Sequence, residues 1–225
     1  MSTSAPNAPG PRTTTPKPTP PPILGSLSEI CIVTPSLHST LDSLTRLGLG
    51  PFRTFVFDGT TVTGQELGGQ CGGDLYTMRV AFAHNHGGDA REPVLEIMEP
   101  VSGATPMRAY LDAHGGRAGV QHVAFGMFGE PMAARRARMA ERGFAPAMAG
   151  VWTGRRGEAR FCFFDTAEQG LPTCFETIEF SGDWEEPACV WYPHPPADEP
   201  GKKKKTEIPG VDARVLAAGY EELLQ

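Results

Sequence analysis

The sequence predicts an α+β fold built from two βαβββ modules. The first observation is the order of elements, because a strand, a helix and three further strands follow one another twice between residues 27 and 181. The second is self-similarity, since SEICIVTP resembles VQHVAFGM and PVLEIMEP resembles TCFETIEF. The corresponding segments lie 80 to 93 residues apart, which indicates a duplication and not a solenoid with its shorter repeats.

The elements of the first half follow from apolar patterning and from turn residues. Short β-branched or alternating runs predict strands, and Leu37, Leu41, Leu44 and Leu47 recur at helical spacing before two glycines. We expect strands at 28–35, 52–58, 75–83 and 93–100, a helix at 37–47, a turn at 58–64 and a Gly-rich loop at 68–73.

The second half repeats the pattern after a linking helix. Thr105 and Pro106 are typical of a helix start, and they open the segment 105–116. A strong helix is expected over 130–143, between Glu-Pro and Arg-Gly. We expect strands at 119–127, 144–152, 158–165 and 171–180.

The duplicated region defines one domain, at 25–184, with extensions on both sides. Module one spans 27–104, the linking helix 105–116 and module two 119–181. Residues 1–24 hold eight prolines and little apolar area, which predicts a disordered Pro/Thr-rich arm. Residues 185–210 read as a Pro/Lys-rich linker, and 211–225 as a C-terminal helix with apolar residues at helical spacing.

Composition excludes several classes of protein. No run approaches 18 apolar residues, so no membrane span is expected. The net charge of -6 argues against a nucleic-acid surface. Five cysteines without a CxxC motif imply neither a disulfide framework nor a zinc ribbon. A reducing compartment fits best, so we expect a cytoplasmic protein, with the mitochondrial matrix as the less favoured alternative.

Four polar side chains occupy equivalent places in the two modules. Glu29 and His122 lie on the first strand of each half, Glu96 and Glu176 on the last, and each shares its strand face with apolar residues. Three carboxylates brought together repel, and burial adds to that cost, so a divalent ion would relieve both penalties. Oxygen-rich ligation with one imidazole suits Mn, Mg, Co, Ni or Zn. The alternatives are a core histidine and glutamates on solvated faces of edge strands.

The chain resembles the vicinal oxygen chelate superfamily, which includes glyoxalase I, methylmalonyl-CoA epimerase, bleomycin-resistance proteins and extradiol dioxygenases. The resemblance rests on GVQHVAF following VLEIMEP and on the last hairpin FFDTAEQGLPTCFETIEF, and it covers about Ser28 to Phe180. It implies an open, cupped sheet with helices outside. It also implies that Glu96, His122 and Glu176 bind a metal ion. Glu29 falls where the epimerases have His, and it either ligates or acts as a base beside the metal.

The chemistry that the resemblance implies is proton transfer at the carbon next to a carbonyl, with a metal-stabilised enolate. In the epimerase pattern, an acidic residue before the third strand serves as the base. Asp74 and Tyr76 are the nearest candidates here, and Glu29 is their rival.

Three further residues are candidates for substrate binding. Arg79 and Arg160 occupy equivalent strand positions and are expected to pair with a substrate carboxylate or phosphate, unless they are surface arginines. Trp152 is expected to line an apolar pocket or the core.

The function expected from these features is a metal-dependent isomerase, epimerase or lyase acting on an acyl-CoA or a small oxygenated metabolite. The alternatives are a natural-product tailoring enzyme and a non-catalytic module that sequesters a ligand. We expect a small-molecule substrate and a homodimer, since exposed sheet edges favour pairing.

Overall fold

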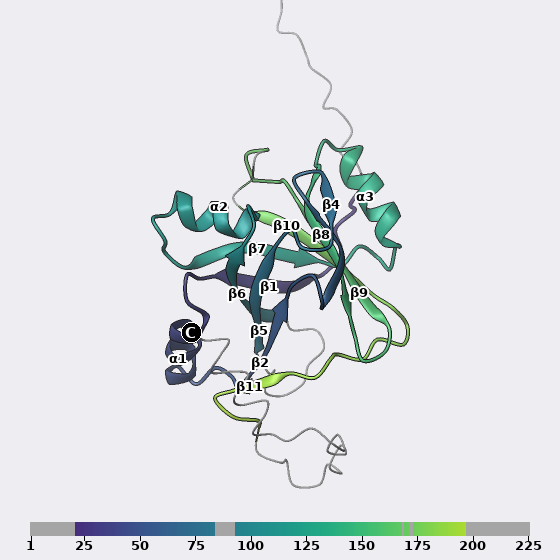
Figure 1. Cartoon of the computed structure of the whole chain (residues 1–225). Coiled ribbons are helices and arrows are strands. Elements are labelled where there is room, and N and C mark those ends of the chain that lie inside the picture. Colours follow the sequence, from purple (N-terminus) through teal and green to yellow (C-terminus); the bar gives the residue numbers. More distant parts are fainter. Residues whose placement is uncertain (1–20, 84–92, 168, 172, 197–225) are drawn as a thin grey trace, which may run out of the picture.

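A computed structural model describes residues 21–83, 93–167, 169–171 and 173–196, and places them as one curled sheet with three helices outside (Figure 1). The helices are α1 (Leu37–Arg46), α2 (Pro106–Ala113) and α3 (Met132–Ala140). The strands of module one are β1 (Leu27–Val33), β2 (Phe52–Phe57), β3 (Val62–Leu67), β4 (Gln70–Gly72), β5 (Thr77–Ala83) and β6 (Val94–Ser102). Those that follow are β7 (Gly119–Phe125), β8 (Pro146–Thr153), β9 (Glu158–Phe164), β10 (Cys174–Phe180) and β11 (Val190–Tyr192).

Two of the three helices, α1 and α2, begin at a capping side chain. Ser36 accepts a hydrogen bond from the Ser39 amide at the start of α1, and Thr105 accepts one from the Arg108 amide at the start of α2. Each helix buries an apolar stripe, which holds it on the outside of the sheet. The residues of these stripes are Leu37 and Leu41 in α1, Met107 and Leu111 in α2, and Met132 and Met139 in α3.

The two modules are joined at the middle of an eleven-stranded sheet, whose order is β11-β2-β5-β6-β1-β7-β10-β9-β8-β3-β4. β1 pairs with β6 in parallel and with β7 antiparallel, and β7 pairs in parallel with β10. The first and last strands of both modules are therefore four consecutive strands. The sequence duplication is thus expressed as a pseudo-symmetric centre of the sheet.

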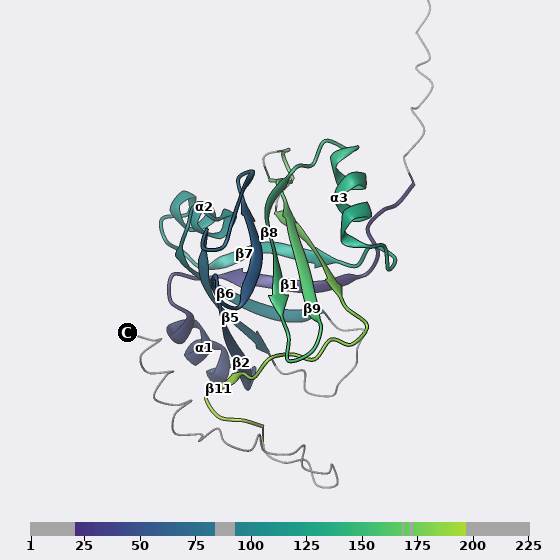
Figure 2. The same cartoon turned by 45° about the vertical axis from the view of Figure 1, so that its right-hand side comes forward.

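The sheet curls so that its two arms face each other across a cup (Figure 2). β2 and β8 are far apart in strand order, yet the Trp152 ring lies 4.9 Å from the rings of both Phe55 and Phe57. Phe57 also stacks on Phe161 with ring centroids 5.9 Å apart. These contacts form the apolar core inside the cup and confirm the predicted open, cupped architecture.

The structure differs from the sequence prediction at residues 62–72. We expected turns and a loop, but Val62 begins β3, which pairs with β8 of the other module and with β4. Val62 and Gln65 are fully buried there. The strand is stabilised by a partner more than 80 residues away, which local turn signals do not reveal.

The extensions are shorter than predicted on both sides of the domain. Ile23 is buried against the cluster around α3, although we assigned it to the disordered arm. Residues 185–192, assigned to the linker, pack on the domain, and β11 forms an edge by pairing with β2. Most of the arm, the lysine run and the expected helix at 211–225 lie outside the described residues. None of the described helices is long and apolar enough to cross a membrane.

Candidate metal centre and adjoining cavity

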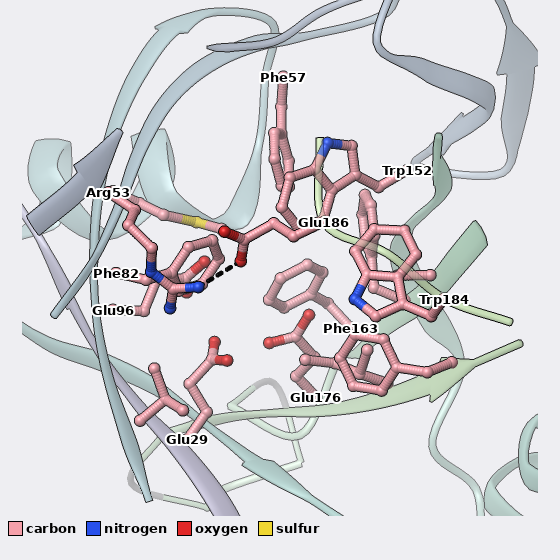
Figure 3. Close-up of a pocket in the computed structure, with 16 residues that line it drawn as sticks. Glu29, Arg53, Phe57, Phe82, Glu96, Trp152, Phe163, Glu176, Trp184 and Glu186 are labelled. Atoms are coloured by element: carbon pink, nitrogen blue, oxygen red, sulfur yellow. Dashed lines mark hydrogen bonds and ion pairs between the residues drawn. The ribbon is translucent and has the colours of Figure 1, made fainter. Parts of the chain in front are cut away.

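Glu29, Glu96, His122 and Glu176 converge at the centre of the sheet. They come from the four consecutive strands β1, β6, β7 and β10, and each offers a ligand atom within 4.8 Å of the others. The exposed fraction of these residues is 5% or less. Figure 3 shows the three glutamates pointing into one space. The alternation of side chains predicted these four residues, and the strand order explains why they meet.

The His122 ring is held between two kinds of oxygen. Its Nδ1 lies 2.6 Å from Gln121 Oε1, which can only accept, so Nδ1 carries a proton. Its Nε2 faces the carboxylates, at 3.1 Å from Glu96 Oε2 and 3.4 Å from Glu176 Oε2. Phe163 packs against the ring edge-to-face at 4.8 Å. In the neutral imidazole, this orientation presents the Nε2 lone pair to the centre of the cluster.

Two carboxyl groups of the cluster, Glu29 and Glu176, resist ionisation in the absence of a cation. Burial, and then the charges of Glu96 and Glu176, raise the pKa of Glu29 well above its ordinary value. Burial raises the pKa of Glu176 to about 7, although His122 acts in the opposite direction. Burial alone would lower the pKa of His122, but its contacts with Glu176 and Glu96 outweigh burial and raise that pKa to about 9. Negative charge on these buried groups is therefore costly unless a cation lies beside them.

The donor set fits a divalent metal ion. Glu176 Oε2 is buried and makes no hydrogen bond to any described residue, which is a costly arrangement for an ionised oxygen. Three carboxylates and one imidazole are ligands that Mn, Mg, Co, Ni or Zn accept. Cys31 also lies within reach of Glu96 and His122, but burial holds its pKa well above the ordinary value and its thiol protonated. Glu96, His122 and Glu176, with Glu29, are the residues that would hold the ion.

A cavity of about 150 Å³ opens directly onto three of these residues. Glu29, Glu96 and Glu176 form one wall of it. Aromatic rings from both arms of the cup form most of the rest, namely Phe57, Phe82, Trp152, Phe161, Phe163, Phe180 and Trp184. A small apolar chamber with convergent polar groups at one end is typical of a small-molecule site.

Of the other residues predicted to act on a substrate, only Trp152 lines this cavity. Asp74 is exposed and does not line it. Tyr76 is buried, but its hydroxyl donates to the Ala149 carbonyl oxygen at 2.9 Å, and burial raises its pKa above the ordinary value. Asp74 and Tyr76 therefore do not line the cavity, and Glu29 is the predicted acid–base residue that does.

The two arginines predicted to bind substrate also lie outside the cavity. Arg79 is on the helix-covered face of β5 and pairs with Glu99 at 3.1 Å. Arg160 is exposed on β9 and pairs with Glu158. They occupy equivalent positions, as the repeat predicted, but those positions face away from the inside of the cup.

Sequence reasoning missed three residues that the structure brings to the site. Arg53 and Glu186 line the cavity and form an ion pair at 2.5 Å (Figure 3). Gln121 orients His122. Only the position of Gln121, beside a candidate ligand, was a signal in the sequence. Arg53 and Glu186 are separated by 133 residues, and no periodicity links them.

The chain was compared with curated proteins and with solved structures. No curated protein matches the chain in sequence. Solved structures with a similar fold include a methylmalonyl-CoA epimerase, with 15% identity and a TM-score of 0.46 over 72% of this chain and 99% of that one. The epimerase from Mycobacterium tuberculosis has 17% identity and a TM-score of 0.47, over 74% and 90% of the two chains. A mutant of 4-hydroxymandelate synthase from Streptomyces coelicolor has 16% and 0.48, over 72% and 50%.

The family assignment rests on a match of sequence. Residues 29–163 match the model of the Glyoxalase/Bleomycin resistance protein/Dioxygenase superfamily. The matched segment includes Glu29, Glu96 and His122 and ends before Glu176. Because it spans more than half of the 225 residues, the chain belongs to the Glyoxalase/Bleomycin resistance protein/Dioxygenase superfamily.

Proposed function

We propose that this protein is a divalent-metal-dependent enzyme, an isomerase, epimerase or lyase, that acts at the carbon next to a carbonyl of a small molecule. The observation that carries the proposal is the convergence of Glu29, Glu96, His122 and Glu176 at the end of a cavity lined by aromatic rings. A buried set of three carboxylates and an imidazole is costly unless it serves a cation. Its location at a cavity connects that cation with a ligand.

In this proposal Glu96, His122 and Glu176 hold the ion, and Glu29 either completes the ligand set or carries the proton. Glu96 and Glu176 contact His122 directly, and these three would hold the ion. A bound divalent ion would supply Lewis-acid stabilisation of negative charge on a substrate oxygen. Glu29 lines the cavity, so its carboxylate can take a proton from a bound molecule and return it. The aromatic walls exclude water from this exchange.

The size of the cavity favours a small oxygenated metabolite over an acyl-CoA as the substrate. A small oxygenated metabolite fits a chamber of about 150 Å³, whereas the nucleotide of an acyl-CoA would have to lie outside it. A non-catalytic ligand-binding protein is the second candidate, because the same cavity would serve it. In the enzyme Glu29 is a candidate for proton transfer, whereas in a binding protein it would transfer no proton.

The test is metal analysis of the purified protein and of two variants. We expect about one divalent ion per chain after reconstitution with Mn, Co, Ni or Zn, and its loss in His122→Ala. His114→Ala is the matched control, since His114 is exposed and stacks on Tyr110 away from the cluster. Wild-type protein that takes up none of these ions would overturn the proposal.

Glu29→Gln separates the two roles of Glu29 and the two candidate functions. If Glu29 carries the proton, the variant keeps its ion and its ligand but no longer exchanges the substrate's α-proton with deuterated solvent. If Glu29 is a ligand, the variant binds the ion more weakly. A binding protein would show no proton exchange in the wild type.

A further inference from the structure

The cavity is the size of a single ring. Its volume of about 150 Å³ is that of a cavity that accommodates one benzene molecule, and most of its lining residues are apolar. Rings from both arms of the cup bound it, and Trp152 lies 4.9 Å from Phe57 and 5.2 Å from Trp184. Such walls favour a flat body, because ring faces and edges make the best contacts with another ring.

The basic side chain of the cavity is neutralised by an ion pair. Arg53 is the single cation among the lining residues, and Glu186 neutralises it at 2.5 Å. Both side chains are about one quarter exposed, at 26% and 28%. The guanidinium carbon lies over the Phe82 ring, 5.9 Å from its centroid, within the range of a cation–π contact. Even with a divalent ion bound, the three ionised glutamates of the cluster outweigh it by one negative charge, so an anionic substrate would meet no net positive charge in the cavity.

The segment that carries Glu186 is held in place from both ends. It leaves β10, and its Glu185 amide donates to the Arg156 carbonyl oxygen at 3.0 Å beside the β8–β9 turn. Arg155 donates from Nε to the Glu186 carbonyl oxygen at 3.0 Å. β11 then pairs with β2, on the other arm of the cup. Glu186 is thus fixed by backbone contacts and not by its salt bridge alone.

One N–H group of the Arg53–Glu186 pair can still donate a hydrogen bond to a ligand. Arg53 Nε is buried and has no hydrogen-bond partner among the described residues. Its N–H can donate to an uncharged oxygen, such as a carbonyl or hydroxyl. A carbonyl accepts that bond without bringing a fourth negative charge beside Glu29, Glu96 and Glu176.

We propose that the cavity takes an uncharged, ring-sized substrate bearing a carbonyl or hydroxyl oxygen, and that Glu186 determines this specificity by neutralising Arg53. The proposal rests on the proposed function, because it names the substrate class of the same site. It excludes carboxylates, phosphates and nucleotide esters as ligands of the cavity.

The test compares two probes that share one ring and one carbonyl carbon, of which one is neutral and the other is an anion. Benzamide and benzoate have the same ring, and their binding to the full-length protein is measured by quenching of Trp152 and Trp184 fluorescence and by calorimetry. We expect wild-type protein to bind benzamide in preference to benzoate and not to bind acetyl-CoA. In Glu186→Gln the freed Arg53 should strengthen benzoate binding by about tenfold or more, with benzamide affinity little changed.

Two further variants control for structure. Glu185→Gln removes a neighbouring glutamate that pairs with Arg156 and does not line the cavity, and it should leave both affinities unchanged. The double variant Arg53→Gln with Glu186→Gln removes both charges and should restore the preference for benzamide, even if Glu186→Gln alone loosens the segment.

The proposal is overturned if wild-type protein prefers benzoate, if Glu186→Gln leaves the preference unchanged, or if neither probe binds. Metal content is measured on the same samples. A metal-free protein that still prefers benzamide would contradict the proposed function and not this inference. A metal-loaded protein that prefers benzoate would contradict this inference alone.

Discussion

The orientation of the His122 ring depends on Gln121, the residue before it in the sequence. Gln121 is 5% exposed, and its Oε1 accepts from His122 Nδ1 at 2.6 Å. Thr173 anchors the same residue by donating to the Gln121 carbonyl oxygen. Partners of this kind set the tautomer and the orientation of a ligating imidazole.

Gln121→Leu should therefore weaken metal binding without unfolding the protein. Loss of a hydrogen-bond partner to a ligating histidine typically costs about 10–100-fold in metal affinity. Competition with a chromophoric chelator measures the change, and circular dichroism checks the fold. Gln121→Glu keeps an acceptor oxygen and should retain most of the affinity. Equal affinity in Gln121→Leu and the wild type would show that Gln121 does not position His122.

At the residue scale, the sequence identified the cluster but not its surroundings. Alternation along strands placed Glu29, Glu96, His122 and Glu176 among apolar neighbours, and each of them is buried. Alternation also gave Arg79 and Arg160 equivalent positions, but it does not say which face of a curled sheet is the inner one. That choice depends on where the helices pack.

The buried side chain of Gln65 joins the β3–β4 hairpin to the start of β5. Gln65 accepts from the backbone amides of Leu75 and Tyr76 at 2.6 and 3.1 Å and donates to the Tyr76 carbonyl oxygen at 3.2 Å. The residue is fully buried. These bonds hold the start of β5 against β3, which in turn pairs with β8.

Gln65→Leu should be strongly destabilising. It leaves two amides and a carbonyl buried without partners, and each unsatisfied group costs about 1–3 kcal/mol. We expect the free energy of unfolding to fall by about 3 kcal/mol or more in urea denaturation. Gln70→Leu, on the exposed strand β4, is the matched control and should change it by less than about 0.5 kcal/mol. Comparable losses in both variants would contradict this role of Gln65.

At the scale of elements, existence was easier to predict than pairing. Helices with caps and strands with apolar patterns were placed within a few residues of their bounds. The hairpin at 62–72 and the edge strand β11 were missed because their stability comes from β8 and β2 and not from local propensity. The homodimer stays a prediction. Both edges of the sheet, β4 and β11, are three residues long, and short edges offer little backbone for pairing with a second chain.

Because folding buries the acidic cluster, the stability of the whole molecule depends on pH. In the metal-free protein, Glu176 keeps its proton to a pH of about 7 and His122 to about 9, against about 4.3 and 6.5 for these side chains in an unfolded chain. Over that range the folded state binds more protons than the unfolded state. Stability falls with rising pH under that condition.

We therefore expect the melting temperature of metal-free protein to be lower at pH 8 than at pH 5.5. A divalent ion should reverse the difference, since it binds the deprotonated ligands and its stabilising effect grows with pH. Thermal melts at both pH values, with and without the ion, measure this. His122→Ala should show no response to the ion. Metal-free protein that is more stable at pH 8 would contradict the expectation.

The sequence by itself determined the duplicated βαβββ order and the four residues of the acidic cluster, because strand alternation and self-similarity can be read directly from it. It indicated the family through the resemblance of a few segments to known motifs. Only the tertiary structure decided which face of the sheet is the inner one, which arm covers which, and that Arg53 meets Glu186. Those features arise when segments more than 100 residues apart pack together, and packing is determined by the shape of the whole core and not by any one stretch of it.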